Sequence, residues 1–376
     1  MKVCGLVAEF NPFHNGHVLY LEKAQELSQA DIYILAMSPN FVQRGEPAIM
    51  DKERRTLAAL DNGVDLVIEI PTIYTLQNAD LYAKAALHML EDLGADCVVF
   101  GTESGDTETF LQKFENKEFV SPRMDEIIQE YLAEGYSYPK AKAEASRIVN
   151  DFYLENPNDI LGYSYLKIIT QNKLKIKPLC YQRINNEKSI GRSGEYSSAM
   201  AIRNAIKVNR SLFDEHHFLD DYFNLLKYKI VTTKAKDLEK IHLVDEGIEN
   251  LFKKNIVKAR DMEDFINMCT SKRYSGARIK RTICHILLNT DKKDAKAILR
   301  KKPPYIRLLG SSPKGRKYLA SIRKDTEANI LTRFAAKDNP LLLSELIASE
   351  VYYLGSRSLE KHDYQLKELR NFPVKI

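Results

Sequence analysis

Two sequence patterns meet in the stretch Val7-Ala8-Glu9-Phe10-Asn11-Pro12-Phe13-His14-Asn15-Gly16-His17. The apolar residues 3–8 are typical of a buried strand, and Asn11-Pro12 is a turn signal. Apolar residues then recur at helical spacing over residues 18–27. The stretch therefore joins a strand to a helix. In an α/β sheet this is the edge where ligands bind, at the carboxyl ends of the strands.

The two histidines of this stretch suit a phosphate group. His14 and His17 are three residues apart, so both can face one side of a helix start. Each ring offers an N–H to a phosphate oxygen, and helix N-terminal amides also favour anions. Gly16 lacks a Cβ, so a base or a phosphate can approach the backbone closely. A loop with two surface histidines is the alternative, but the strand before and the helix after favour a nucleotide site.

The same stretch resembles the nucleotidyltransferase superfamily that carries the His-x-Gly-His signature. The resemblance implies a Rossmann-like sheet and chemistry at the α-phosphate of a nucleoside triphosphate, with release of pyrophosphate. It also implies that His14 and His17 contact the phosphates. Such an in-line displacement depends on positioning and charge stabilisation and needs no nucleophile from the protein.

Composition sets broad limits on the class of protein. The chain has 376 residues, enough for two or more domains, and its 44% hydrophobic and 28% charged content is ordinary for a globular protein. No apolar run reaches the roughly 18 residues of a membrane helix, and the first residues lead directly into a strand pattern, so we expect no signal peptide. Five scattered cysteines without metal-ligand spacing predict reduced thiols, no bound metal and a cytoplasmic protein: Cys4, Cys97, Cys180, Cys269 and Cys284.

Strand and helix patterns alternate through the first part of the chain. Further strands are expected at residues 31–37, 64–70 and 95–100, with helices at 51–60 and 76–90. This alternation predicts βαβ units, a parallel sheet and right-handed connections. The charged section 108–155 is helix-like and is expected to pack against the sheet edge. Residues 175–183 are expected to form the last strand of the sheet, with Arg183 at its exit.

Several residues at strand ends are candidates for nucleotide contacts. Arg44 lies in a polar loop and is either a phosphate contact or a solvated side chain. Lys52 and Arg55 can reach phosphate from the next helix, although a solvated helix face is the simpler interpretation. Gly101 would let adenine or ribose lie against the backbone, unless it only forms a turn. Asn158 would hold a nucleotide or cap a helix.

A second candidate phosphate motif lies at residues 196–203. Serines that open a helix offer hydroxyl and amide donors, and Arg203 adds a fork of donors one turn later. Enzymes of the His-x-Gly-His type commonly carry Ser-Ser-Thr-x-Ile-Arg at a late helix start. Ser198 and Ile202-Arg203 match it, whereas Ala199 and Met200 stand where hydroxyl residues are usual.

From about residue 209 the strand–helix alternation stops and helical patterns follow. We therefore expect two domains: a Rossmann-like α/β domain over 1–208 and an all-helical domain over 209–376. The net charge is +5, which is compatible with a nucleic-acid partner. The second domain carries clustered basic residues that either contact RNA or form solvated helix faces: Lys272, Arg273, Arg278, Lys280 and Arg281.

More specifically, segments along nearly the whole chain resemble the tRNA(Met) cytidine acetate ligase family: residues 5–17, 38–45, 100–103, 158–162, 274–281 and 305–310. The resemblance implies that ATP activates acetate to acetyl-adenylate, and that the acetyl group then moves to N4 of the wobble cytidine of elongator tRNA(Met). It makes His14, His17, Ser198 and Arg203 catalytic and adds Mg²⁺ with the ATP. The implied ATP contacts are Val7, Ala8, Glu9, Phe10, Asn11, Pro12, Phe13, His14, Asn15, Gly16, His17, Val18, Leu19, Tyr20, Gly101, Asn158 and Arg183.

Two other functions share the first motif. An adenylyl- or cytidylyltransferase of a small coenzyme precursor would not need basic helices after the sheet. A nucleotide-binding protein without catalysis would be favoured by loss of either histidine, and both His14 and His17 are present. A hydrolase with a Ser-His or Cys-His pair is not favoured, because the sequence has no nucleophile elbow. No protein partner is identifiable from the sequence.

Overall fold

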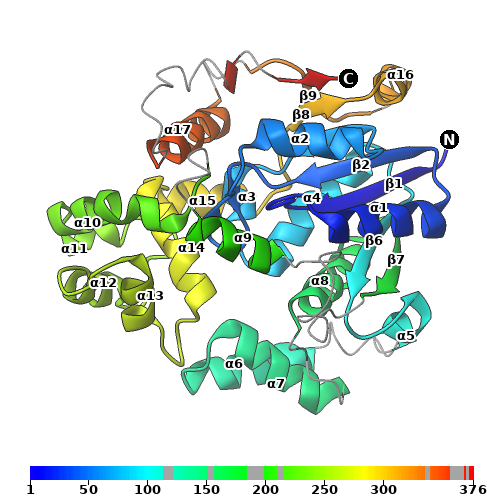
Figure 1. The fold of residues 1–376 in the computed structure, drawn as a ribbon. Helices are drawn as coiled ribbons and strands as arrows, with labels where there is room; N and C mark the ends of the chain where they lie inside the picture. Colours follow the sequence, from blue (N-terminus) through cyan, green and yellow to red (C-terminus); the bar gives the residue numbers. More distant parts are fainter. Residues whose placement is uncertain are drawn as a thin grey trace.

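A sheet of eight strands forms the centre of the computed structural model (Figure 1). Five of the strands are parallel and adjacent, in the order β5-β2-β1-β6-β7. They are β1 (Val3–Ala8), β2 (Ile32–Met37), β5 (Leu66–Glu69), β6 (Cys97–Thr102) and β7 (Lys177–Gln182). The structure describes residues 1–112, 122–150, 154, 156–183, 199–209, 216–324, 326–334, 339–355, 368–369 and 372–376.

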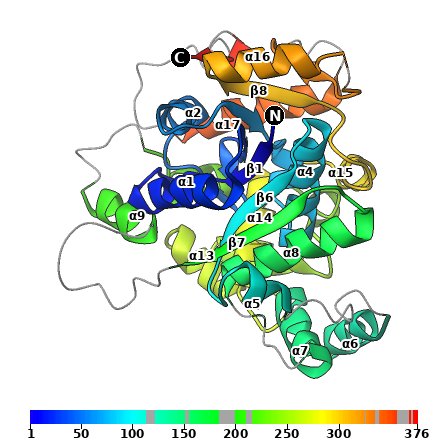
Figure 2. The same ribbon diagram turned by 90° about the vertical axis from the view of Figure 1, so that its right-hand side faces the viewer.

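Helices cover both faces of this parallel part, as Figure 2 shows. One apolar cluster packs α1 (Asn15–Ser28) and α2 (Lys52–Asp61) against one face, and another packs α4 (Ala79–Asp92) and α8 (Pro157–Asn172) against the other. All six residues of β2 are buried, because both of its faces are covered. The expected α/β fold with a mainly parallel sheet is therefore confirmed. The chain reverses direction across the sheet between β1 and β6, so the ends of these strands form a topological switch point.

Short elements follow the central strands. A hairpin of β3 (Phe41–Val42) and β4 (Glu46–Pro47) comes after β2, and the single turn α3 (Thr72–Thr75) precedes α4. The helix expected at 76–90 starts later, because Asn78 caps it by accepting a hydrogen bond from the Leu81 N–H.

The section between β6 and α8 only partly follows expectation. α5 (Thr107–Gln112) packs against β7. α6 (Pro122–Ala133) and α7 (Tyr138–Asn150) instead pack on each other around a small apolar cluster of their own. The prediction that this whole section lies on the sheet edge is therefore wrong for α6 and α7.

A second group of helices has a separate apolar core, which includes Leu226, Phe252, Phe265 and Ile283. After α9 (Ala199–Val208), this part of the chain runs through α10 (Phe223–Thr232), α11 (Ala235–Leu238), α12 (Ile248–Ile256), α13 (Met262–Cys269), α14 (Gly276–Leu287) and α15 (Lys292–Leu299).

The chain after residue 209 is not all helical, contrary to expectation. β8 (Ile306–Ser311) is entirely buried and pairs antiparallel with β5. β9 (Ile330–Leu331) and β10 (Val374–Lys375) then pair parallel with β8. β7 is thus an edge strand but not the last strand in the chain. α16 (Pro313–Ile322) lies beside β8, and α17 (Pro340–Leu354) packs on α3 (Figure 1).

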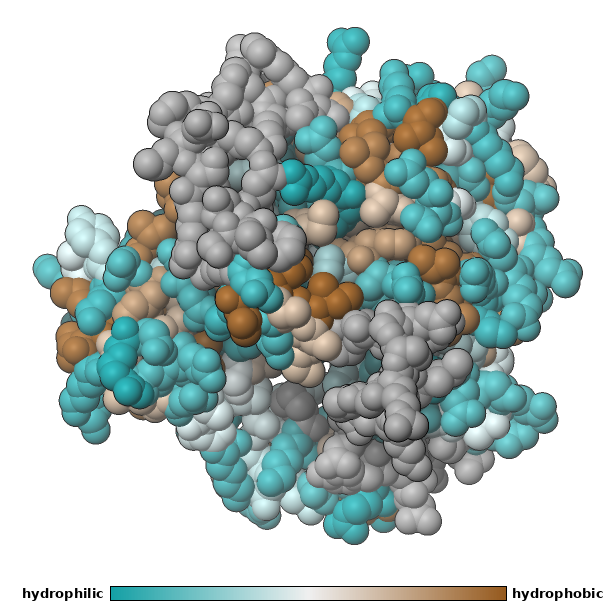
Figure 3. All heavy atoms as spheres, viewed as in Figure 1, coloured by the Kyte–Doolittle hydropathy of each residue, from teal (hydrophilic) through white to brown (hydrophobic). Residues whose placement is uncertain are grey.

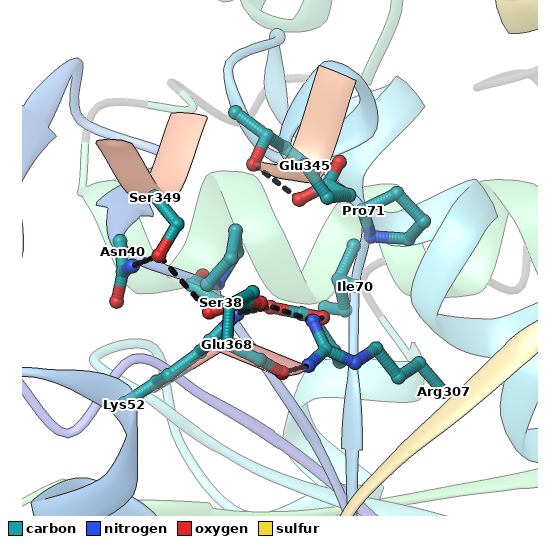
Figure 4. Close-up of polar contacts among 12 residues, drawn as sticks. Ser38, Asn40, Lys52, Ile70, Pro71, Arg307, Glu345, Ser349 and Glu368 are labelled. Carbon is teal, nitrogen blue, oxygen red and sulfur yellow. Dashed lines mark hydrogen bonds and ion pairs between the residues drawn. The ribbon is translucent and has the colours of Figure 1, made fainter. Parts of the chain in front are cut away.

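A buried ion network holds the late elements against the sheet (Figure 4). It consists of Lys52, Glu69, Arg307 and Glu368, which come from α2, β5, β8 and the segment 368–369. Lys52 pairs with Glu69 at 2.5 Å and also with Glu368, and Arg307 pairs with Glu69 at 2.8 Å and also with Glu368. Ser349 of α17 adds a hydrogen bond of 3.0 Å to Glu368. Every charge of the network has a partner of opposite sign.

No helix within the described ranges is long and apolar enough to cross a bilayer. The five cysteines are buried and unbridged. In the same ranges no three His, Cys, Asp or Glu side chains are grouped as a metal ion would require.

Candidate functional site: the loop between β1 and α1

The turn after β1 has a strained backbone that several side chains hold in place. Phe10 is fully buried and has a φ of +47°, which is costly for a residue with a Cβ. The Arg55 guanidinium donates a 2.9 Å hydrogen bond to the Glu9 carbonyl. The Asn11 side chain accepts one of 2.7 Å from the Ile49 N–H, and the Asn11 carbonyl accepts one of 2.8 Å from Arg203. The signature loop (residues 7–20) is thereby fixed before any ligand arrives.

His14 caps α1, which determines where its proton lies. Its Nδ1 accepts a 2.9 Å hydrogen bond from the Gly16 N–H, so the proton of the neutral ring lies on Nε2. A Cβ at Gly16 would lie 2.7 Å from Cε1 of the same ring. The missing Cβ of Gly16 therefore leaves room for the His14 ring, and the close approach of a base or a phosphate stays a prediction.

His17 lies behind His14 in an aromatic environment. The two ring centroids are 4.0 Å apart, and the Phe10 ring lies 4.7 Å from His17. Burial holds the pKa of His17 well below its usual value and also lowers the pKa of His14. Both imidazoles are therefore neutral near pH 7. The His17 Nδ1 is enclosed and has no hydrogen-bond partner among the described residues.

Two arginines face the histidines. The charges of Arg183 and Arg203 further lower the pKa of His14, so both guanidiniums lie near its ring. Gly101, at the end of β6, lies under Arg183: a Cβ there would lie 2.8 Å from Arg183 Cγ and 3.0 Å from Tyr181 Cζ. The structure therefore brings together His14, His17, Gly101, Arg183 and Arg203.

Asn158 lies at the edge of this group but does not cap α8. The cap residue is Asn156, so a cap role for Asn158 is wrong. The Asn158 amide instead donates a 2.5 Å hydrogen bond to Glu103, just after β6. The buried Asp159 supports the same turn, because it accepts 2.9 Å and 3.2 Å hydrogen bonds from the Glu103 and Ser104 N–H groups.

Glu103 and Glu9 are site residues whose contacts the sequence did not indicate. The second carboxylate oxygen of Glu103 is enclosed and has no partner in the described part of the chain. Glu9 accepts a 2.8 Å hydrogen bond from the Gln43 N–H, and burial raises the pKa of its carboxyl. Gln43 lies in the segment 38–45 that the family resemblance had singled out, and that resemblance was the only signal in the sequence.

The suggestion that Lys52 or Arg55 reaches phosphate is wrong. Lys52 belongs to the buried ion network. Arg55 is buried and donates to the carbonyls of Ser38 at 2.9 Å and Pro39 at 2.5 Å. These two cations hold the fold, and their pattern of charges in the sequence only resembled a solvated helix face.

The signature loop itself divides into surface and core. Val7, Ala8, Glu9, Phe13, His14 and residues 16–19 are partly accessible, and Asn15 is exposed. Tyr20 is buried, and its hydroxyl donates a 2.8 Å hydrogen bond to the Val99 carbonyl. Ser198 lies outside the described residues.

Hydrophobic residues gather in the middle of the face where Figure 1 places α1 and α9, as Figure 3 shows.

Three of the five predicted RNA-contacting residues lie close to Glu246 or to an aromatic ring. Arg273 and Arg278 approach the Glu246 carboxylate at 3.2 Å and 3.5 Å. Lys272 is exposed, and its ammonium lies 3.7 Å from the centre of the Tyr136 ring. A single carboxylate therefore serves two guanidiniums, and further carboxylates, Asp245 and Glu249, lie beside it.

The other two predicted RNA-contacting residues hold α14 against the β3–β4 hairpin. Lys280 forms an ion pair with Glu46, and Arg281 donates a 3.5 Å hydrogen bond to the Gln43 carbonyl. Gly45 packs directly against α14. This is possible only because it has no side chain, since a Cβ there would overlap the backbone of Lys280 and Arg281. Part of the basic cluster therefore has a structural role.

Comparisons with known proteins identify the family of this chain. The family model described as HIGH Nucleotidyl Transferase matches residues 1–367. A "tRNA(Met) cytidine acetate ligase" of Bacillus licheniformis is 35% identical, with 98% of this chain and 97% of that protein covered. Another, of Clostridium perfringens, is 37% identical, with 98% and 99% covered.

A solved structure is similar over its full length. It is Thermotoga maritima TmcAL bound with alpha-thio ATP, with a TM-score of 0.89, 30% identity and complete coverage of both chains. The family match, the full-length relatives and the signature loop lead to one conclusion. This chain belongs to the HIGH nucleotidyl transferases and, within them, to the tRNA(Met) cytidine acetate ligase family.

Proposed function

We propose that this protein uses ATP to activate acetate as acetyl-adenylate and transfers the acetyl group to N4 of the wobble cytidine in elongator tRNA(Met). The names of full-length relatives support the overall reaction. The observation that carries the proposal is the signature loop. Two neutral imidazoles and two guanidiniums meet there, at the carboxyl ends of β1, β6 and β7.

In the first step an acetate oxygen attacks the α-phosphorus of ATP, and the bond from that phosphorus to the pyrophosphate oxygen breaks. Negative charge accumulates on the leaving pyrophosphate and on the equatorial oxygens. His14 donates its Nε2–H to these oxygens, His17 and Arg203 add further donors, and Arg183 contacts the bound nucleotide. Because the hydrogen bonds of the loop already fix His14 and Arg203, little reorganisation is needed during the reaction.

In the second step the exocyclic amine of the cytidine attacks the acetyl carbonyl. The bond from that carbon to the adenylate oxygen breaks, AMP leaves and the amine loses a proton. The mixed anhydride is reactive enough for this weak nucleophile. The cytidine must first leave its stack to reach the pocket. Ser198, which lies outside the described residues, remains a predicted phosphate donor at the start of α9.

The remaining nucleotide contacts are proposed at the ends of β6 and β7. Gly101 lies beside Arg183, and Asn158 is bonded to Glu103 just after the same strand, so both are proposed to contact the ribose or the base. The enclosed Glu103 oxygen is a suitable acceptor for a ribose hydroxyl. These contacts lie on the same edge of the sheet as His14.

Mg²⁺ is proposed to accompany the triphosphate and to neutralise the leaving pyrophosphate. Glu9 is the one carboxylate within residues 7–20. Mg²⁺ usually keeps several waters and takes one or two carboxylates together with substrate phosphates, so the donor set of the loop fits an ion carried by ATP.

The helical part of residues 209–376 is proposed to bind the tRNA. Its cations Lys272, Arg273 and Arg278 cluster in the sequence, and the two arginines share one carboxylate, Glu246. Contacts with RNA phosphates would give an affinity that decreases steeply with salt.

Mass spectrometry of nucleosides tests the proposal directly. Full-length protein is incubated with elongator tRNA(Met) transcript, ATP and isotope-labelled acetate. We expect labelled N4-acetylcytidine that requires ATP and is absent from a transcript with uridine at the wobble position. Pyrophosphate release with a phosphorylated coenzyme precursor, but not with acetate, would instead support the adenylyl- or cytidylyltransferase alternative.

A further inference from the structure

A cavity of about 180 Å³ lies apart from the signature loop, between α14, α4 and α7. It is several times larger than the roughly 30 Å³ that one water molecule takes in the liquid. Figure 3 shows the surface hollowed between the helices at the left and the α6–α7 pair below. Its described lining residues include two arginines and no carboxylate: Gln77, Asn78, Ser137, Tyr138, Leu243, Ser275, Arg278 and Arg281.

The helices around this arginine cavity present their positive ends to it. Ser275 caps α14, Asn78 caps α4, and Ser137 immediately precedes α7. Each of these helices has at least twelve residues, so each N-terminus carries about half a positive charge.

Of the two arginines, only Arg278 has an acidic partner among the described residues, and it shares that partner, Glu246, with Arg273. The Arg281 Nε is enclosed and has no hydrogen-bond partner among the described residues. Two further carboxylates, Asp80 and Asp125, lie near the lining residue Tyr138, and Asp80 is paired with Lys142 at 2.9 Å and Lys167 at 3.1 Å. Burial, together with the charge of Arg278, lowers the pKa of Arg281 to about 10. An anion between the two guanidiniums would remove this repulsion.

The position of the cavity favours RNA over ATP as the source of that anion. Gln43 separates the cavity from the signature loop: its carbonyl accepts from Arg281 at 3.5 Å, and its N–H donates to Glu9 at 2.8 Å. ATP is proposed on the Glu9 side of this residue. The exposed Lys272 lies at the cavity's outer side, because its carbonyl accepts a 3.1 Å hydrogen bond from the Ser137 N–H.

We propose that the arginine cavity holds one backbone phosphate of the RNA substrate and so fixes the register of the tRNA next to the signature loop. The inference rests on the proposed tRNA function. Exposed lysines supply affinity without fixed geometry, whereas a guanidinium pair in a built cavity also sets position.

Two substitutions of the α14 cap residue provide a matched test. Asp and Asn both cap helices well, so S275D and S275N differ mainly by one negative charge inside the cavity. We measure binding of elongator tRNA(Met) transcript to full-length protein at several salt concentrations. We expect S275D to bind at least about tenfold more weakly than S275N. We also expect Arg278→Gln to lower the slope of log affinity against log salt by about one.

Controls separate this inference from the proposed function. Lys317→Gln removes one exposed charge from α16, far from the cavity in Figure 1, and is expected to change tRNA binding less than twofold. Thermal unfolding checks that each variant is folded. If the wild type acetylates tRNA but S275D and S275N bind it equally, the cavity proposal is wrong and the proposed function stands. If S275D weakens inhibition by inorganic phosphate but not tRNA binding, the cavity takes a free anion and the proposal is also wrong.

Discussion

The buried ion network and the signature loop both gather cations, but among the described residues only the network places each cation in an ion pair. At the loop, Glu9 and Glu46 act on Arg203 without a direct ion pair. Lys52 and Arg307 share the carboxylates of Glu69 and Glu368, away from solvent. At the signature loop, Arg183 and Arg203 face the neutral ring of His14. Balanced charges hold the fold together, whereas unbalanced cations mark a place for an anion. The same contrast separates Lys280, which pairs with Glu46, from Arg281 in the arginine cavity.

The largest loss of stability is expected in the buried ion network, where every charge has a partner of opposite sign. Lys52→Met leaves two buried carboxylates with one cation, and the loss of one partner of a buried pair costs about 3–5 kcal/mol. Urea unfolding measures the free energy. The control is Lys302→Met, whose exposed pair with Asp92 at 2.7 Å should cost less than about 1 kcal/mol. Equal losses in the two variants would show that burial does not distinguish these pairs.

Substitutions at the signature loop should lower activity rather than stability. His14→Ala removes a fixed donor to the α-phosphate and should lower acetate-dependent pyrophosphate release about 100- to 1000-fold, while tRNA still binds. His88→Ala, in α4, is the histidine control and should leave the rate unchanged. Near-normal pyrophosphate release by the His14 variant would contradict the mechanism.

Glu345 of α17 is an extra carboxylate beside the balanced network, and it makes stability depend on pH. Burial, together with the charge of Glu69, raises its pKa to about 8. The stability that Glu345 contributes is therefore fully present below its unfolded pKa of about 4.3 and is lost as the pH rises through 8. Between pH 5.5 and 8.5 wild type should lose roughly 2–3 kcal/mol relative to Glu345→Gln in urea unfolding. Parallel pH profiles would refute this assignment.

A smaller effect on catalysis is expected from Arg183, which lies at the exposed edge of the signature-loop site. Arg183 is exposed at the end of β7, so Arg183→Gln should raise the KM for ATP about tenfold with little change in kcat. Lys175→Gln, before the opposite end of the same strand, removes an equal charge and serves as the control. A fall in kcat with an unchanged KM would instead mean that Arg183 acts only in the transition state.

The sequence predicted the features that local patterns determine. The apolar runs of β1, β2, β5, β6 and β7 and the turn before His14 were visible, because each depends on neighbouring residues. The pairing of β8 with β5 was not, since it joins segments separated by more than 200 residues, such as Ile68 and Leu308. Helical patterns on both sides of residues 306–311 led to the wrong prediction of an all-helical domain.

Roles that depend on distant partners were also missed. Arg55 resembled a solvated side chain until the carbonyls of Glu9, Ser38 and Pro39 were seen around it. Gly16 was correctly selected for its missing Cβ, but the group that fills the space is the ring two residues earlier. In both cases the residue type was informative, and only the fold identified the neighbour.

The late arrival of β8 has a consequence for synthesis on the ribosome. Residues 66–69 are made early, yet the strand that covers their free edge emerges some 240 residues later, as the register of Leu66 with Ser311 implies. Until then the nascent chain exposes unpaired amide and carbonyl groups along an apolar strand, a template for association with other chains. A chaperone that shields such edges would therefore raise the yield of this protein more than that of a sheet built in chain order.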